Sequence, residues 1–199
     1  MNYCFGVDIG GTTVKIGLFE ETGTIVEKWE IPTNTLADER QFAGYCIFVK
    51  NKIEERKLSE EDILGIGVGV PAPVTAEGIV NGSANLGWKY KESEKGNGRA
   101  DRFESVHRND ANVAALGEMW KRRRSRRKNM IMVTLGTGVG GGVIIDGKML
   151  VGNNGAGGEI GHICVNYEEN DRCGCGNKGC LEQYASATGI VRLAEQKLK

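Results

Sequence analysis

Short apolar runs separated by turn residues open the chain, and this pattern predicts strands. Residues 3–9 are almost continuously apolar, Gly10-Gly11 makes a tight turn, and residues 14–19 form a second run. A third run covers residues 24–31, after a turn that contains Gly23. Because each turn is only a few residues long, we expect these three strands to form an antiparallel meander.

A helical spacing follows the meander. Between residues 36 and 57 apolar side chains recur every three or four positions, which predicts an amphipathic helix. These side chains are Phe42, Tyr45, Cys46, Val49 and Ile53. Residues 63–70 form another short apolar run, and Pro71 and Pro73 end it because proline cannot donate to a sheet. The first part of the chain therefore has the predicted order β-β-β-α-β.

The second half of the chain mixes helix and strand patterns. Residues 91–108 are polar and show no clear period, so we expect a loop or a poorly ordered segment there. Asn109 or Asp110 is available as an N-cap for a helix at 111–120. We then expect strands at 130–135, 143–145 and 148–151, a hairpin turn at Asp146-Gly147, and a final helix at 180–199.

Two segments repeat one pattern of strand, Gly/Thr turn and returning strand. They are GVDIGGTTV at residues 6–14 and VTLGTGVGG at residues 133–141. The repeat predicts two related α/β domains that face one cleft. We place a small N-terminal domain at residues 1–110 and the start of a larger domain at residues 111–199.

Both glycine turns have the composition of a phosphate site. Glycine lets the backbone approach a ligand and directs N–H groups at phosphate oxygens, and threonine adds a hydroxyl donor. Asp8 would repel a bare phosphate, but it fits a site in which Mg²⁺ lies between them. Hairpin turns without a ligand are the alternative. The candidate ATP-binding residues are Asp8, Gly10, Gly11, Thr12, Gly136, Thr137 and Gly138.

Composition and charge exclude several classes of protein. The 199 residues include 26 basic and 26 acidic side chains, which excludes a globally basic nucleic-acid binder. Seven of the eight residues at 121–128 are basic, and such a run is more typical of a solvated link than of a DNA or membrane contact. No apolar run approaches the roughly 20 residues of a membrane span, and residues 1–11 lack a signal-peptide pattern. We expect a cytoplasmic protein that binds neither nucleic acid nor membrane.

The six cysteines indicate a metal site or free thiols before disulfides, because a cytoplasmic chain keeps its thiols reduced. One histidine and three cysteines follow the spacing H-x10-C-x-C-x4-C, with glycines between them. One His and three Cys make a closed tetrahedral set for structural Zn²⁺. The expected ligands are His162, Cys173, Cys175 and Cys180. Cys164 competes for a ligand position, and a disulfide within the group is the alternative.

Six motifs, taken in order, resemble the ROK family of sugar kinases and repressors. They are the strand–DIGGT–strand opening, GVGVPAPV at 67–74, NDANVAALGE at 109–118, LGTGVGGG at 135–142, GEIGH at 158–162 and CGCGNKGCLE at 173–182. The resemblance implies the two-domain actin/hexokinase-like (ribonuclease H-like) fold and a dimer or tetramer. It also implies ATP-dependent phosphorylation of a hexose at its 6-hydroxyl, glucose foremost. N-acetylglucosamine, N-acetylmannosamine and fructose are alternative substrates, and a sugar-binding fragment or regulator without turnover is the alternative outside the enzymes.

The resemblance also assigns roles to individual polar residues. On the sequence alone, Asp110 is better explained as a helix N-cap. In the family, the matching Asp is the catalytic base and the Asn before it, here Asn109, binds the sugar. Glu159 and His162 lie three residues apart, so they face one site if this stretch is helical. The sugar contacts that the resemblance implies are Glu159, His162 and Glu182, with Asn85 as a weaker candidate.

Three features depart from the family pattern. The chain ends at Lys199, in the helix after the cysteine motif, whereas family members continue, so we expect an incomplete second domain. Residues 91–108 lack the expected helix and strand, and residues 122–127 are basic where the family has a glycine-rich link. Local frameshifts are one explanation. We expect no helix-turn-helix domain ahead of the first strand, and therefore no repressor.

Overall fold

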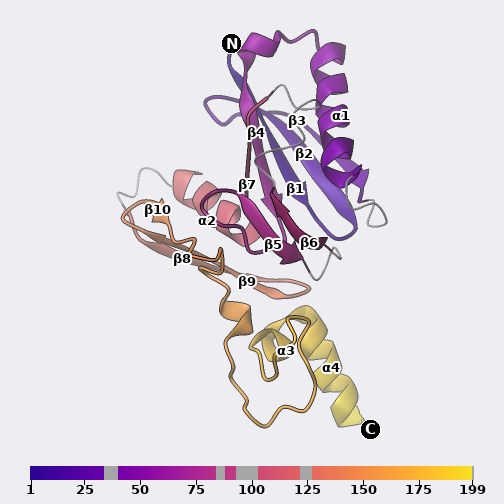
Figure 1. Ribbon diagram of the computed structural model, residues 1–199, viewed down its shortest axis with the longest axis vertical. Helices are drawn as coiled ribbons and strands as arrows, with labels where there is room; N and C mark the ends of the chain where they lie inside the picture. The colour runs from indigo at the N-terminus through magenta and orange to yellow at the C-terminus, as the bar shows by residue number, and fades with distance from the viewer. Residues whose placement is uncertain (34–39, 84–87, 93–102, 122–126, 199) are drawn as a thin grey trace. The chain divides into compact units, whose positions relative to one another are not determined.

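The computed structural model describes residues 1–33, 40–83, 88–92, 103–121 and 127–198 (Figure 1). Two subjects of the sequence analysis, Asn85 and most of the basic run (residues 122–126), lie outside the described residues. The chain divides into two compact units, Met1–Asp110 and Ala111–Lys199. Both units combine helices with sheets, so the predicted α/β class is confirmed.

A five-stranded sheet in the order β3-β2-β1-β4-β7 forms the centre of the first unit (Figure 1). The bounds are β1 Tyr3–Ile9, β2 Thr13–Glu20, β3 Ile25–Pro32, β4 Ile63–Val70 and β7 Ser105–Asn109. The first three strands pair antiparallel, and β4 and β7 extend the sheet from β1 by parallel pairing. The predicted meander and the predicted strand at 63–70 are therefore confirmed.

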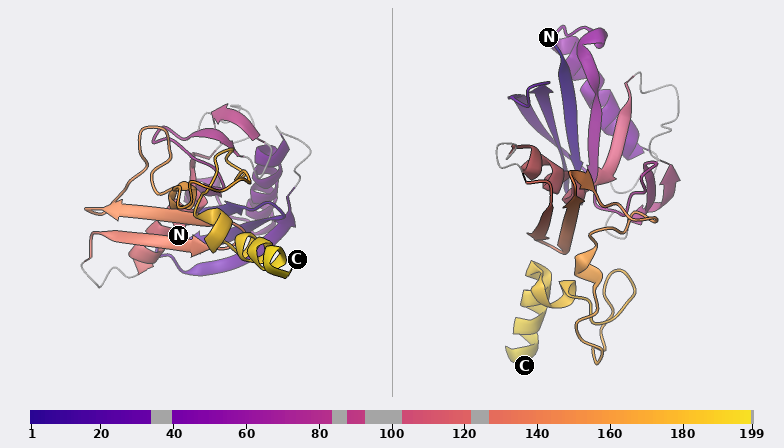
Figure 2. Two further views of the ribbon diagram at one scale, coloured as in Figure 1. Left: turned by 90° about the horizontal axis from the view of Figure 1, so that it is seen from below. Right: turned by 90° about the vertical axis from the view of Figure 1, so that its left-hand side faces the viewer.

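Helix α1, Arg40–Glu55, lies along one face of this sheet (Figure 2). Its side chains Tyr45, Val49 and Ile53 are buried in one core cluster with strand residues such as Phe5 and Val68. The helical spacing predicted this element because the same three-to-four-residue period determines which side chains face the sheet. A short 3-10 turn, Glu60–Asp62, leads into β4.

The prediction of a loop over residues 91–108 is wrong at both ends. Strand β6, Trp88–Glu92, pairs with β5, Ile79–Ser83, and β7 occupies the end of the range. The side chains that β7 buries are all polar: Ser105, His107 and Asn109. Their alternation therefore carries no hydrophobic signal, and it is parallel pairing with β4 that makes this segment a strand.

The second unit begins with helix α2, Asp110–Lys121, which continues from the first unit, and contains a three-stranded antiparallel sheet, β10-β9-β8. The strands are β8 Met130–Leu135, β9 Val139–Ile145 and β10 Lys148–Met149. The predicted strands lie at these places, although β9 begins earlier and β10 ends earlier than expected. Asp146 and Gly147 have positive φ values of 50° and 77°, as the predicted two-residue hairpin requires.

The predicted helix at 180–199 is two helices. Helix α3, Glu182–Ala185, ends at Ser186, whose backbone is extended, and α4, Ala187–Leu198, follows. The Ser186 hydroxyl accepts the N–H of Gly189 at 2.9 Å, which is an N-cap contact. Periodicity does not separate the two helices, because the interruption is a single residue. None of the helices in the described segments is both long and apolar enough to cross a membrane.

Candidate functional site

The carboxyl ends of three parallel strands bring the candidate residues of the first unit to one edge of its sheet. Asp8 of β1 is in register with Gly69 of β4, and Gly69 is in register with Arg108 of β7. The first glycine turn follows β1, and Asn109-Asp110 stands where β7 ends. Since β1 and β7 are two strand spacings apart, Asp8 lies about 10 Å from Arg108, two residues before Asp110. Open α/β sheets bind ligands at this kind of edge.

Hydrogen bonds hold the first glycine turn in a fixed shape. The N–H of Gly10 donates to the carbonyl of Thr13 at 2.9 Å, and the Thr33 hydroxyl donates to the carbonyl of Gly10 at 2.7 Å. A Cβ at Gly10 would stand 2.8 Å from the Thr13 oxygen, so a larger residue would distort the turn. The exposed residues of the turn are Gly11 and Thr12.

Two carboxylates and one amide stand at this sheet edge. Asn109 is buried, and its amide nitrogen donates to the carbonyl of Ala72 at 3.2 Å. Asp110 is the first residue of α2, where the N–H groups of the first helical turn favour a negative charge. Desolvation raises the pKa of Asp8, and the charge of Lys15 opposes that shift. A cation bound beside Asp8 would favour its ionised form.

The second glycine turn, between β8 and β9, is held by the start of α4. The N–H of Ala187 donates to the carbonyl of Gly136 at 2.9 Å, and the Thr188 hydroxyl donates to the carbonyl of Thr137 at 2.8 Å. Within the turn, the N–H of Gly136 donates to the carbonyl of Gly138 at 3.0 Å. The shape of this turn therefore depends on where α4 begins.

Glu182 links the second glycine turn to the cysteine motif. One carboxylate oxygen accepts the N–H of Val139 at 3.0 Å, and the other accepts the thiol of Cys173 at 3.5 Å. A Cβ at Gly138 would collide with this carboxylate, so the link requires glycine there. The link has no local sequence signal, because 43 residues separate Glu182 from Val139.

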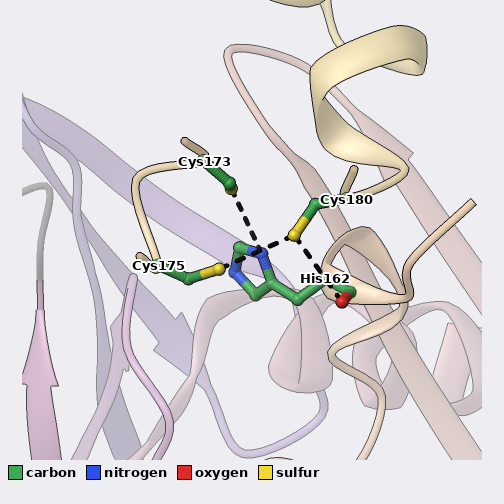
Figure 3. A group of neighbouring side chains, drawn as sticks. All are labelled: His162, Cys173, Cys175 and Cys180. Atoms are coloured by element: carbon green, nitrogen blue, oxygen red, sulfur yellow. Dashed lines mark hydrogen bonds between the residues drawn. The ribbon is translucent and has the colours of Figure 1, made fainter. Parts of the chain in front are cut away.

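Four side chains gather into a cluster with metal-ligand chemistry (Figure 3). They are His162, Cys173, Cys175 and Cys180, and their donor atoms all lie within 4.8 Å of one another. The Cys173 sulfur is 3.7 Å from His162 Nδ1, and the sulfurs of Cys175 and Cys180 are 3.7 Å apart. With Zn–S bonds of about 2.3 Å, tetrahedral ligand atoms stand about 3.8 Å apart. The donor set and its spacing fit such a site.

The thiols of this cluster are poorly placed to ionise alone. Cys173 and Cys180 are buried, whereas Cys175 is exposed. Burial and the neighbouring thiols raise the pKa of Cys180 to about 12, and burial also raises the pKa of Cys173. A bound cation is therefore what would let the cluster carry thiolate charge. All six cysteines are free thiols, and Cys164 is outside the group of four.

His162 presents its two ring nitrogens to different neighbours. It ends the 3-10 turn Ile160–His162; Nδ1 faces the Cys173 sulfur, and Nε2 is 3.9 Å from a Glu159 carboxylate oxygen. Glu159 and His162 thus lie side by side, as their spacing predicts. A metal ion on Nδ1 would leave the proton on Nε2, directed at Glu159.

Comparison with known proteins agrees with the motifs. A family model described as "ROK family" matches residues 4–199. A glucokinase from Halalkalibacterium halodurans is 42% identical over 198 residues, which cover 96% of this chain and 58% of the relative. An N-acetylmannosamine kinase from Vibrio cholerae is 35% identical over 192 residues, which cover 95% of this chain and 63% of the relative.

A solved structure shows the same likeness in three dimensions. The ROK family glucokinase from Streptomyces griseus in complex with glucose and AMPPNP matches with a TM-score of 0.82 at 34% identity. The match covers 98% of this chain and 61% of that chain. The fold is therefore actin/hexokinase-like, as the motifs implied. The chain spans less than two thirds of the length of these relatives.

Proposed function

The chain belongs to the ROK family, and on this premise we propose that the protein is an ATP-dependent kinase that converts glucose to glucose 6-phosphate. The observation that carries the proposal is the sheet edge at which Asp110 begins α2 beside the anchored amide of Asn109. The likeness to glucokinases supports it. Because the chain spans 58% of the first of these relatives, the activity is proposed for the whole protein.

Asp110 is the general base in this proposal. Its carboxylate takes the proton of the sugar 6-hydroxyl while that oxygen attacks the γ-phosphorus of ATP, and the bond to the β-phosphate oxygen breaks with release of ADP. The N–H groups at the start of α2 stabilise negative charge at this position. Asn109, anchored on the carbonyl of Ala72, orients a sugar hydroxyl beside it.

The two glycine turns hold the phosphates of ATP in this proposal. Backbone N–H groups and threonine hydroxyls bind phosphate oxygens, and the compact shape of each turn keeps them close to the ligand. Asp8 provides the carboxylate for Mg²⁺, which when bound neutralises phosphate charge. The proposed residues are Asp8, Gly10, Gly11, Thr12, Gly136, Thr137 and Gly138.

Glu159, His162 and Glu182 contact sugar hydroxyls in this proposal. Three thiols and His162 Nδ1 would hold Zn²⁺ with no open coordination position, so the ion would cross-link the chain and perform no chemistry. The cross-link would fix the His162 ring and with it Nε2 beside Glu159. We therefore expect sugar affinity to fall when the metal is removed.

A kinase for an N-acetylated hexosamine is the second candidate, and the likeness to an N-acetylmannosamine kinase favours it. Related sugars are separated by pocket contacts worth only about 1–3 kcal/mol, so both candidates use the same chemistry at Asp110. A cytoplasmic location is part of the proposal, since a reducing compartment keeps thiol ligands available for a metal. A dimer or tetramer remains a prediction from the family resemblance.

The test is ADP release by the purified, Zn²⁺-loaded whole protein with ATP, Mg²⁺ and each of glucose, N-acetylglucosamine, N-acetylmannosamine and fructose. Asp110→Asn is expected to lower kcat on glucose by about 10²–10⁴-fold, the usual contribution of a general base. Asp146→Asn is the matched control, because asparagine also adopts the positive φ of that hairpin residue. If the protein phosphorylates N-acetylmannosamine and not glucose, the second candidate function replaces the first. A folded protein that neither binds nor phosphorylates any of the four sugars would contradict the proposal.

A further inference from the structure

The segment that carries Cys173 has little regular secondary structure to hold it. Between the 3-10 turn Ile160–His162 and α3, the described chain pairs with itself at two isolated bridges and forms no named helix or strand. The backbone hydrogen bonds around Cys173, such as that from its N–H to the Asn177 carbonyl at 2.8 Å, stay within the segment, so side-chain contacts link this part of it to α3 and α4.

Arg192 of α4 reaches three acceptors on or next to this segment. Its guanidinium donates to the carboxylate of Glu169 at 3.0 Å, to the carboxylate of Asp171 at 2.9 Å and to the carbonyl of Gln183 at 3.2 Å. The guanidinium also lies over the ring of Tyr184, 5.7 Å from the ring centroid. A planar group with several donors suits this bridge, whereas lysine would offer a single point of charge.

Glu169 is the main acceptor on the segment. The Tyr184 hydroxyl donates to the same Glu169 oxygen at 2.6 Å, and the amide nitrogen of Asn166 donates to that hydroxyl at 2.9 Å. The Glu169 side chain is only 12% exposed. Tyr184 and then Arg192 hold the pKa of Glu169 at about 2, so the carboxylate stays ionised at neutral pH. These bonds hold Glu169 in one place, unlike an exposed ion pair, which contributes little to the free energy of unfolding.

Gln183 connects these contacts to the chain next to Cys173 and to Cys180. Its amide nitrogen donates to the carbonyl of Asp171, two residues before Cys173, at 3.0 Å. Its amide oxygen accepts the N–H of Cys180 at 3.0 Å. Arg192 contacts both Asp171, through its carboxylate, and Gln183, through its carbonyl. These two residues are hydrogen-bonded to each other and lie two residues before Cys173 and three after Cys180, respectively.

We propose that Arg192 is a positioning residue that presets the metal cluster. By holding Glu169 and Asp171 against α3 and α4, it fixes the segment from which the Cys173 sulfur reaches to 3.7 Å from His162 Nδ1. This inference rests on the Zn²⁺ site proposed above and concerns a residue outside the four donors. Contacts that orient metal ligands typically change metal affinity about 10–100-fold.

The test measures metal binding by the folded chain. Competition with a chromophoric chelator gives the Zn²⁺ affinity, and the absorption bands of the Co²⁺-loaded protein report the ligand geometry. Arg192→Met is expected to weaken Zn²⁺ binding about tenfold and to reduce the tetrahedral Co²⁺ bands, and Arg192→Lys should recover part of both. Glu169→Gln should act in the same direction and add little to Arg192→Met. Lys197→Met, which removes a charge from the last turn of α4, is the matched control and should change neither readout.

The readouts separate failure of the metal site from failure of the positioning role. Wild-type protein that binds neither Zn²⁺ nor Co²⁺ would overturn the metal site and the role of Arg192 together. Metal binding by the wild type with unchanged affinity and spectrum in folded Arg192→Met would overturn only the positioning role. An equal loss in Lys197→Met would overturn it as well. If Arg192→Met does not fold, Arg192→Lys and Glu169→Gln decide the question by the same two readouts.

Discussion

Lowering the pH from neutral to about 4 is expected to destabilise the first unit through one buried histidine. His107 is 1% exposed, and its Nε2 lies 3.1 Å from the hydroxyl of Tyr45, which is equally buried. Burial, followed by the nearby charge of Arg108, lowers the pKa of His107 from 6.5 to about 4. The folded unit therefore keeps this imidazole neutral at pH values where the unfolded chain protonates it.

The direction and size of the effect follow from proton binding. Between pH 6.5 and about 4 the unfolded chain holds more protons than the folded unit, so the free energy of unfolding rises with pH. The stabilisation is complete above pH 6.5 and is lost as the pH falls toward 4. A shift of about 2.5 pKa units corresponds to about 3 kcal/mol near pH 4 and about 2 kcal/mol near pH 5.

Urea unfolding at a series of pH values, followed by circular dichroism, measures this loss. His107→Gln is the control, because glutamine retains hydrogen-bonding capacity toward Tyr45 and does not titrate. The difference between the two proteins removes the contribution of all other titrating groups. Equal pH slopes for the wild type and His107→Gln between pH 6.5 and 4 would refute the reasoning.

Three further predictions concern the second unit. Gly142→Ala should destabilise it by about 1–3 kcal/mol in thermal melts, because the new Cβ would stand 2.5 Å from the Cβ of Ala115. At Gly117 an added Cβ would have no atom within 4 Å, so Gly117→Ala should instead stabilise α2 by about 0.5–1 kcal/mol. Equal melting temperatures for the two variants would contradict this pair of predictions. Cys173→Ser should lose most of its bound Zn²⁺ in elemental analysis, whereas Cys164→Ala should retain it, since Cys164 is outside the group of four. Full Zn²⁺ content in Cys173→Ser would contradict the ligand assignment.

Apolar patterning predicted the parts of the fold whose buried faces are apolar. The inward positions of β1, β4 and α1 are mostly Val, Ile and aromatic residues, so their period is visible in the sequence. Strand β7 instead buries Ser105, His107 and Asn109, whose environment comes from β4 and α1 and cannot be read locally. The break between α3 and α4 at Ser186 was not predicted for a related reason, since its capping contact depends on backbone geometry.

The sequence predicted residue types for the site better than it predicted their partners. The H-x10-C-x-C-x4-C spacing selected four residues that the structure brings within 4.8 Å, but it left Cys164 as a competitor. The contact between Glu169 and Arg192 has no sequence signal, because an acid and a base 23 residues apart resemble any other pair of surface charges. The roles of Asp110, Asn109 and Glu159 in a reaction remain predictions.

Helix α4 supports both halves of the proposed site in the second unit. At its start, Thr188 donates to the carbonyl of Thr137 in the glycine turn, and four residues later Arg192 holds the segment that leads to Cys173. Residues four apart lie on one face of a helix, so one face of α4 serves the turn and the cysteine motif. Glu182 joins the same two regions directly. Because these contacts form one connected set, loss of the metal should loosen the glycine turn as well as the sugar residues. In the proposed kinase, chelation would then weaken ATP binding together with sugar binding.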